Sequence, residues 1–340
     1  MTLDQTLSRS TLAGTQAPLC TGSWSDGELT ILRGNEAFAY ACLDNARHAR
    51  LQLSFNAEAS SDDATRAILL GLEACFAAHE EIQEINLTLP EGFVSPRDLP
   101  FLAVSNNEHW AHRSGFYQNP DLWIFHKTSG RLRTGLVEGP NGRDFPLRPP
   151  HPSGLCYERY DPVADVVVSF RAVDIDRDLD TFHRWMNDGR VAYFWELAQS
   201  KDELRAYLEV LQSKPHTYPL IGCFNGEDAG YFETYWARED RLGAYYASQA
   251  YDRGWHGLIG ERKHLGKVKT GAWLRGLTHY LFLDCPLSEN IMGEPRVDNA
   301  KLLSYADSLA YEKLKEFDFP HKRSALMCCR RDSFFSKVRL

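Results

Sequence analysis

The sequence predicts a mixed α/β protein with two successive domains, of which the first is the smaller. Apolar runs of strand length alternate with longer amphipathic segments in both halves of the chain. A stretch rich in proline and glycine, residues 139–162, lies between the halves and has no periodic pattern, which is typical of a linker. We therefore expect domains at residues 1–150 and 151–340.

The composition is that of a globular protein without a nucleic-acid or membrane partner. The chain has 340 residues, of which 43% are hydrophobic and 25% charged, and a net charge of −8 that disfavours nonspecific binding to nucleic acid. No run of about 18 apolar residues predicts a membrane span. The first residues lack the apolar segment of a signal peptide. Eight scattered cysteines without a CxxC pair predict reduced thiols and a cytoplasmic location.

The first half predicts the order β-β-β-α-β. We expect residues 1–25, which are rich in Ser, Thr and Gly, to be loosely held. A helix is predicted at 60–81, because a capping serine and acidic residues precede an apolar stripe at helical spacing. Alternating or apolar runs predict strands at 28–32, 37–43, 49–55 and 85–89.

The second half predicts the order β-α-α-β-β-β-α-β-α-β-β. The helix beginning at Ser200 has a capping sequence, and the turn "NGEDAG" joins two strands as a hairpin. Helices are expected at 178–188, 200–213, 270–284 and 299–309. Strands are expected at 165–173, 218–224, 231–237, 254–260, 290–294, 312–318 and 324–330.

A basic segment with two glycines, "LIGERKHLGKVKTGAWL" (258–274), joins a predicted strand to a predicted helix. A helix N-terminus carries unpaired N–H donors and positive dipole, so it binds anions such as a pyrophosphate. Gly260 and Gly266 permit close approach of the backbone, and four Lys or Arg residues add charge. The order of elements and this segment suggest an acyl-CoA-dependent N-acyltransferase; a solvated basic loop is the alternative.

Whole phrases of the second half resemble one enzyme family. They include "FHRWMNDGRVAYFWE", "YFETYWAREDRLG", "YDRGWHGLIGE", "EPRVDN" and "KEFDFPHKRS". These resemble the aerobactin-type N6-hydroxylysine acetyltransferases, the siderophore branch of the GCN5-related N-acetyltransferase (GNAT) superfamily. The resemblance is dense over 157–336 and much weaker before it. The superfamily motif, roughly Gln/Arg-x-x-Gly-x-Gly/Ala, is changed at its first and last positions, Lys263 and Val268.

The resemblance implies a GNAT fold in the second half and a reaction without a metal. Acetyl-CoA, or another acyl-CoA, would donate its acyl group to the hydroxylated side-chain amine of N6-hydroxylysine. The product would be a hydroxamate for siderophore biosynthesis. An amine N-monooxygenase would act before this step and a siderophore synthetase after it.

A histidine and an aspartate, His256 and Asp298, are the catalytic pair that the resemblance implies. A hydroxylamine nitrogen that attacks a thioester must lose a proton, which a histidine titrating near neutrality can accept. A carboxylate can orient that histidine, and we expect the two side chains to meet across neighbouring strand ends. A packed core histidine is the alternative. Tyr305 is the expected acid for the leaving thiolate, although relatives place their tyrosine one residue later.

Seven residues are expected to contact acyl-CoA. Three act through the backbone of the strand 254–260, which pairs with the pantetheine arm. Three lie in the basic loop that follows this strand, and one begins the helix predicted at 299–309. They are Leu258, Ile259, Gly260, Lys263, Gly266, Lys267 and Asn299.

Six residues are expected to form the acceptor pocket. Aromatic walls suit a methylene chain, carboxylates suit an ammonium group, and a basic turn suits a carboxylate. These residues are Trp195, Glu196, Glu233, Tyr235, His321 and Lys322. Core aromatics and a solvated basic turn are the alternatives. The histidines show no metal-ligand spacing, so no metal site is predicted.

The first half is expected to be a degenerate, non-catalytic acyltransferase-like domain. Its β-β-β-α-β order is similar to the middle of the second half, but it has no equivalent of the glycine loop after a strand, because Glu80 and Glu81 follow the helix and Pro90 follows the last strand. We therefore expect no CoA binding there.

Several readings stay open at this point. N-hydroxycadaverine or N-hydroxyputrescine, with acetyl-CoA or succinyl-CoA, are alternative substrates. Acetylation of an antibiotic or another amine, and a non-catalytic CoA-binding or scaffold protein, are more distant alternatives. The sequence does not determine the oligomeric state.

Overall fold

The computed structural model describes residues 5–10, 20–25, 28–33, 36–44, 49–55, 61–89, 99–106, 108–126, 129–139 and 144–340. The chain divides into two compact units, Met1–Phe125 with Arg339–Leu340 and His126–Val338. The expected boundary at residue 150 therefore lies inside the second unit. The reason is that Arg148, in the proline-rich stretch, pairs with Glu239 and lies 4.0 Å from the ring centroid of Trp236.

The first unit contains a mixed sheet with the strand order β1-β2-β3-β4-β5-β6-β8-β7. Its strands are β1 (Gln5–Ser10), β2 (Cys20–Ser25), β3 (Glu28–Arg33), β4 (Glu36–Asp44), β5 (Arg50–Phe55), β6 (Glu84–Thr88), β7 (Leu102–Ser105) and β8 (Glu108–His112). Its helices are α1 (Ser61–Ala78), α2 (Arg113–Phe116) and η1 (Pro120–Leu122). The four strands and the helix predicted here are confirmed. The expectation of a loose N-terminus is wrong for β1 and β2, and its remaining residues lie outside the described part.

The second unit contains a second mixed sheet, of order β11-β12-β13-β14-β15-β16-β18-β17. Its strands are β11 (Leu155–Asp161), β12 (Val166–Ala172), β13 (Thr217–Phe224), β14 (Glu227–Trp236), β15 (Arg253–Ile259), β16 (Asn290–Gly293), β17 (Tyr311–Asp318) and β18 (Arg323–Arg330), and β9 (Leu136–Glu138) pairs separately with β10 (Asp144–Pro146). Its helices are α3 (Ile175–Met186), α4 (Gly189–Trp195), α5 (Lys201–Ser213), η3 (Arg241–Ala244), η4 (Arg262–His264), α6 (Lys267–Asp284), α7 (Ala300–Asp307) and α8 (Arg331–Lys337). All predicted elements occur. The prediction missed α4 and α8, and β10 and β11 form where we expected only linker.

The two sheets have the same topology. In each, five strands run antiparallel to their neighbours, a helix then crosses over to a parallel strand, and a final hairpin completes the sheet. The crossover helix is α1 in the first unit and α6 in the second. This repeat supports the proposal that the first half is a degenerate acyltransferase-like domain. Because α1 begins with Ser-Asp-Asp where α6 begins with Lys-Val-Lys, we continue to expect no CoA binding there.

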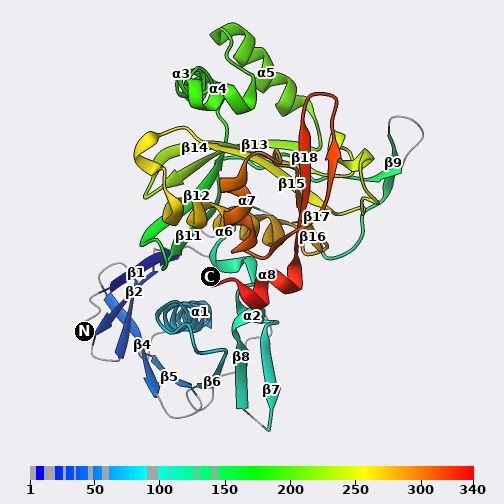
Figure 1. The fold of residues 1–340 in the computed structure, drawn as a ribbon. Helices are drawn as coiled ribbons and strands as arrows, with labels where there is room; N and C mark the ends of the chain where they lie inside the picture. The colour runs from blue at the N-terminus through cyan, green and yellow to red at the C-terminus, as the bar shows by residue number, and fades with distance from the viewer. Residues whose placement is uncertain are drawn as a thin grey trace. The chain divides into compact units, whose positions relative to one another are not determined.

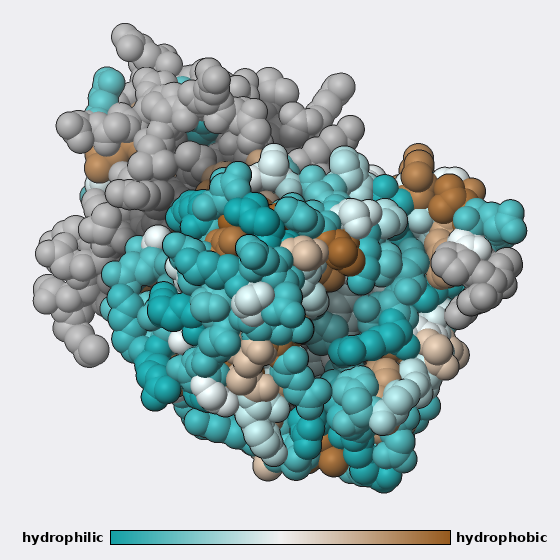
Figure 2. All heavy atoms as spheres, turned by 90° about the horizontal axis from the view of Figure 1, so that it is seen from above, coloured by the Kyte–Doolittle hydropathy of each residue, from teal (hydrophilic) through white to brown (hydrophobic). Residues whose placement is uncertain are grey.

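Helices cover both faces of the second sheet (Figure 1). Neighbouring residues of a strand point to opposite faces. Tyr231 of β14 belongs to the core formed with α3, α4 and α5, whereas the ring of Phe232 lies 5.1 Å from that of Trp273 on α6. The three short helices therefore pack on one face and α6 on the other. Seen from above the short helices, the surface is mainly hydrophilic, with separate hydrophobic patches (Figure 2).

No described helix has both the length and the apolar character needed to cross a bilayer. The seven cysteines whose side chains are described are free thiols.

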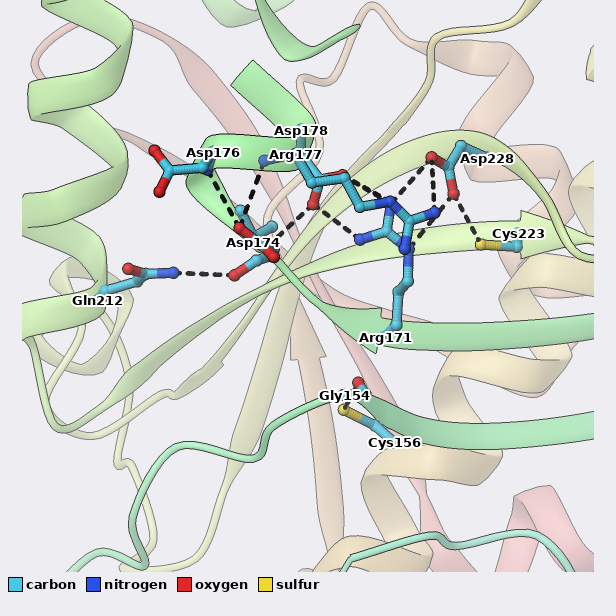
Figure 3. A network of polar contacts seen from close by, with 11 residues as sticks. Gly154, Cys156, Arg171, Asp174, Asp176, Arg177, Asp178, Gln212, Cys223 and Asp228 are labelled. Carbon is cyan, nitrogen blue, oxygen red and sulfur yellow. Dashed lines mark hydrogen bonds and ion pairs between the residues drawn. The ribbon is translucent and has the colours of Figure 1, made fainter. Parts of the chain in front are cut away.

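A buried ion-pair network attaches α3 to the sheet (Figure 3). Arg171 of β12 donates two hydrogen bonds to Asp178 of α3, at 2.7 and 2.8 Å, and one of 2.9 Å to Asp228 of β14. The side chain of Asp178 is only 2% exposed. The network therefore joins two strands to the helix that covers them.

Replacing Arg171 by leucine is expected to lower the free energy of unfolding by about 3–5 kcal/mol, because Asp178 is left as a buried charge without its main partner. Arg177→Leu is the matched control: its side chain is 58% exposed and lies 3.7 Å from the same carboxylates, so we expect less than about 1 kcal/mol. Urea denaturation measures both. Equal losses would contradict the assigned role of Arg171.

Candidate active site

Strands β15 and β16 separate in the middle of the second sheet. β15 pairs with β14 along its whole length, but with β16 only through Arg253 and Gly254. The chain after β16 continues along β18 instead, where the amide of Ala325 donates to the carbonyl of Pro295 at 2.9 Å. The edge of β15 beyond Gly254 is therefore open to an extended ligand.

The hydrogen-bonding pattern decides which backbone groups face this open edge. The amide of Gly260 donates to the carbonyl of Ala229 at 2.9 Å, next to β14. Because such groups alternate along a strand, Leu258 also faces β14, whereas Gly257 and Ile259 face the open edge. Of the three backbone contacts predicted for acyl-CoA, only that of Ile259 is available in this arrangement. Gly257 replaces the other two.

The predicted pyrophosphate loop connects β15 to α6. Gly266 has φ +130° and precedes the helix without a side-chain cap, so the first N–H groups of α6 lack helical partners. Lys267 is exposed at this end, and the ammonium of Lys263 lies 2.6 Å from Glu227. Gly260 is required for a different reason from the one predicted: a Cβ there would lie 2.2 Å from the ring of Trp185.

His256 lies on β15 between two buried glutamates. Its Nε2 is 2.6 Å from Glu294, which follows β16, and its Nδ1 is 3.3 Å from Glu233, which is opposite it on β14. The side chains of Glu294 and Glu233 are 0% and 8% exposed, whereas that of His256 is 22% exposed. The histidine is therefore the part of this trio that solvent or a substrate reaches.

Tyrosine hydroxyls occupy the remaining carboxylate oxygens. Glu233 accepts hydrogen bonds from Tyr207 at 2.5 Å and Tyr231 at 3.0 Å, and Glu294 accepts one from Tyr235 at 2.8 Å. Since a hydroxyl that donates needs an acceptor oxygen, these contacts favour ionised carboxylates.

The charge state of His256 follows from its two partners. Burial opposes the charged ring, but the charge of Glu294 and the hydrogen bonds of both glutamates raise the pKa of His256 to about 10. Burial also opposes the anion of Glu294, yet His256 and Lys322 hold its pKa well below the ordinary value. The raised pKa and the two acceptor carboxylates favour an imidazolium that donates from both ring nitrogens, whereas we expected a histidine that titrates near neutrality. Its role in catalysis stays a prediction.

We expect the imidazole of His256 not to titrate between about pH 5 and 8, where ordinary histidines do. A raised pKa stabilises the fold fully below the unfolded value of 6.5, and this contribution is lost as the pH rises through about 10. The free energy of unfolding should therefore fall as the pH rises from about 6.5 to about 10, and it should fall more in the wild type than in His256→Gln. NMR titration of the ring tests the charge state directly, and a midpoint near 6.5 would refute it.

Asp298 does not meet His256, which corrects the predicted pair. The chain follows β18 as far as residue 297 and then turns, with the amide of Asn299 donating to the carbonyl of Arg296. At this turn the carboxylate of Asp298 is 53% exposed and lies 2.9 Å from the guanidinium of Arg296. Glu294, four residues earlier, takes the expected position beside the histidine.

The other predicted residues surround this centre at different depths. Tyr235 lies beside His256, with ring centroids 4.8 Å apart, and Trp195, at the end of α4, is 6.5 Å away. Lys322 donates to the carbonyl of Glu294 at 2.9 Å. Glu196 and His321 are exposed. Burial, Arg241 and Lys322 lower the pKa of His321, and the negative charge of Glu196 partly offsets this. We call the charged and titratable residues around this centre the rim; they are Glu196, Arg241, Arg296, Asp298, His321 and Lys322.

Asn299 and Tyr305 were predicted at and after the start of one helix, α7. Asn299 caps α7, because its side chain accepts from the amide of Leu302 at 3.2 Å; its contact with CoA stays a prediction. Tyr305 is half-buried on the same helix, and its role as an acid also stays a prediction.

Sequence reasoning missed Glu294 and Arg241. Arg241 lies 3.6 Å from the carboxylate of Glu294. A signal for Glu294 was present: it is the last residue of the strand predicted at 290–294, whereas Asp298 lies four residues farther along. No group of three metal-ligating side chains occurs among the residues that the structure describes.

Comparison with known proteins gives three consistent matches. The acetyltransferase (GNAT) domain family matches residues 174–319. N(6)-hydroxylysine O-acetyltransferase from Escherichia coli is 39% identical over 269 residues, which cover 79% of this chain and 85% of the relative. An N(5)-hydroxyornithine:cis-anhydromevalonyl coenzyme A-N(5)-transacylase from Beauveria bassiana is 40% identical over 56% of this chain, but the match spans only 43% of that protein.

A crystal structure shares the fold of the second unit. An uncharacterized protein from Bacillus halodurans aligns with a TM-score of 0.52 and 29% identity, covering 54% of this chain and 94% of that protein.

Proposed function

The chain belongs to the GNAT acyltransferase family that includes N(6)-hydroxylysine O-acetyltransferase, and on this premise we propose that it acetylates the hydroxylated side-chain amine of N6-hydroxylysine. It is an acyl-CoA-dependent N-acyltransferase, and the proposed donor is acetyl-CoA. The product is a hydroxamate, whose two oxygens bind iron in a siderophore. The single observation that carries the proposal is the His256 trio beside the open edge of β15.

The open edge is the proposed place of the thioester. The backbone of Gly257 and Ile259 would pair with the pantetheine arm, and an amide there would polarise the thioester carbonyl. The unpaired N–H groups of α6, with Gly266 and Lys267, would hold the pyrophosphate. The nearby His256 then faces the carbon that the acceptor nitrogen attacks.

Proton transfer in this arrangement starts from a charged histidine. As the new C–N bond forms and the C–S bond breaks, one proton passes from the acceptor nitrogen to the thiolate. We propose that His256 gives a proton to the leaving sulfur, is neutral for a moment, and regains a proton from the nitrogen, with Glu294 and Glu233 stabilising the imidazolium before and after the two transfers. Tyr305 stays a second candidate for the donation to sulfur.

The rim suits an acceptor that retains its amino-acid head. Glu196 would bind an α-ammonium group, and Lys322, His321 and Arg241 would bind an α-carboxylate. Trp195 and Tyr235 would contact the methylene chain. N-hydroxycadaverine and N-hydroxyputrescine lack the carboxylate, so the rim favours hydroxylysine over these two.

The test offers acetyl-CoA and succinyl-CoA with N6-hydroxylysine, N-hydroxycadaverine, N-hydroxyputrescine and lysine, and measures thiol release. Iron(III) colour separates the N-acyl product, which is a hydroxamate, from an O-acyl ester. We expect fastest release with acetyl-CoA and hydroxylysine, together with iron colour. With a hydroxylated amine, thiol release without colour would mean O-acylation; with lysine it would mean acetylation of an ordinary amine. CoA binding without thiol release from any pair would favour the non-catalytic alternative.

The chemistry of the substrates also implies neighbouring reactions. An amine N-monooxygenase must supply the hydroxylated amine, and a siderophore synthetase would consume the hydroxamate. These partners and a cytoplasmic location stay predictions.

A further inference from the structure

His264 is buried inside the loop that connects β15 to α6. It is 5% exposed and ends the short helix η4. Its ring lies 5.2 Å from that of Phe224, at the end of β13. The mechanism above gives this histidine no role, and it occupies a variable position of the superfamily motif that the loop resembles.

Charged groups from two other elements meet this histidine. The ammonium of Lys269, in the first turn of α6, lies 3.0 Å from Nδ1 of His264 and donates to the carbonyl of Lys263 at 3.3 Å. On the other side of the ring, Nε2 lies 3.4 Å from Glu227 of β14, which also pairs with Lys263. The neighbouring strand β13 contributes only the uncharged ring of Phe224.

These contacts determine the protonation of the ring. An ammonium group has no lone pair and can only donate, so Nδ1 of His264 must accept the hydrogen bond from Lys269. The proton of the neutral ring is then on Nε2, which lies 3.4 Å from Glu227 without a hydrogen bond to it. A second proton on Nδ1 would remove the acceptor and place a positive charge 3.0 Å from the ammonium of Lys269.

We propose that neutral His264 is a positioning residue for acyl-CoA, because its hydrogen bond with Lys269 ties the pyrophosphate loop to the first turn of α6, beside Glu227 of β14. The inference rests on the proposed function, in which this loop and this helix start hold the pyrophosphate. The ammonium of Lys269 is held by His264 and by the carbonyl of Lys263 within the loop, so it does not extend toward the ligand. The exposed Lys267 is left to face the phosphates.

The proposal predicts that acid weakens CoA binding. Burial, with the charges of Lys269 and Lys263, lowers the pKa of His264 from its usual 6.5. At neutral pH the loop therefore mostly contains neutral His264 with its hydrogen bond to Lys269. As the pH falls below about 6.5, the ring is increasingly protonated and the loop loses this stabilising hydrogen bond. Binding of acyl-CoA should weaken as the loop is released, while the acceptor and the His256 trio are unaffected.

The test measures the Kd of CoA and the KM of acetyl-CoA from about pH 8 to pH 5.5 in the full chain. Phosphate groups of CoA titrate in the same range, so the comparison is with His264→Gln, whose amide accepts from Lys269 and donates toward Glu227 but does not titrate. We expect wild type and His264→Gln to agree at pH 8. As the pH falls below about 6.5, the wild type should bind progressively more weakly than the variant, by up to about tenfold once the ring is protonated, the value of one charge-assisted hydrogen bond.

Two further variants keep the test decisive if glutamine does not fit. At pH 8, His264→Phe and Lys269→Met should each bind CoA about tenfold more weakly than the wild type, with kcat at saturating acetyl-CoA retained, and the difference should shrink as the wild-type ring is protonated. Parallel pH profiles for wild type and His264→Gln, or a loss in kcat without a change in KM, would overturn the proposal. Normal CoA binding without acyl transfer would instead contradict the proposed function, and absence of CoA binding at pH 8 would contradict both.

Discussion

Replacing His256 by alanine is expected to lower kcat for acyl transfer at least about a hundredfold, the usual scale for a group that moves a proton in the transition state. The structure adds a second consequence. Without the ring, Glu233 and Glu294 are two buried carboxylates that share no cation between them. Their pKa values should rise, and the protein should lose about 3–5 kcal/mol of stability.

A second variant separates catalysis from stability. His256→Gln retains an amide donor for one glutamate and fits the same space better than alanine. It should regain part of the lost stability but none of the activity, because an amide does not transfer protons at these pH values. The kcat, the urea midpoint and the Kd of CoA measure the three effects. Wild-type kcat in either variant would show that His256 is a core residue only.

Replacing Glu294 by glutamine is expected to lower kcat about a hundredfold and to change its pH dependence. Among the groups that raise the pKa of His256, the charge of Glu294 is the largest. Without it, the pKa of the histidine should fall toward its ordinary range, so that the ring becomes neutral as the pH rises through about 6.5. The residual activity should therefore show an inflection that the wild type lacks.

Asp298→Asn is the matched control, since it also replaces a carboxylate by an amide. This carboxylate is exposed and pairs with Arg296 at the rim, so we expect kcat within about fivefold of wild type and a raised KM for the hydroxylated acceptor. The opposite result, with Asp298→Asn inactive and Glu294→Gln active, would return the catalytic role to Asp298. NMR titration of His256 in both variants checks the charge argument independently of turnover.

Much of the fold was predictable because it depends on local patterns. The apolar stripe of α1, the capping serine of α5 and the hairpin between β13 and β14 each signal an element within a few residues. Elements with weak local signals were missed. Examples are α4, which has only seven residues, and β10, which has three. The boundary was expected at residue 150, but the two units divide between Phe125 and His126. Proline content alone does not show that the stretch before residue 150 packs on the second unit.

The candidate site was predictable in part. Resemblance and position on a strand both indicated His256, and the loop before α6 was visible from its glycines and lysines. The partner of His256 was not visible, because two carboxylates follow β16 within five residues and the sequence does not say which turns inward. Nor did it show that Gly257, and not Gly260, faces the open edge, because this depends on which amide β14 occupies.

By itself, the sequence determined the order of those elements that have strong local signals, the two-part α/β organisation, the family resemblance and the histidine at the centre of the candidate site. These follow from short-range periodicity, turn chemistry and motif phrases. Only the tertiary structure showed that the two sheets repeat one topology, that Glu294 takes the place expected for Asp298, and that His256 lies between two buried carboxylates that raise its pKa. The physical reason is that partner choice and pKa depend on burial and on distances of about 3 Å between residues far apart in the chain. Such distances are set by strand register and strand separation, which no local pattern contains.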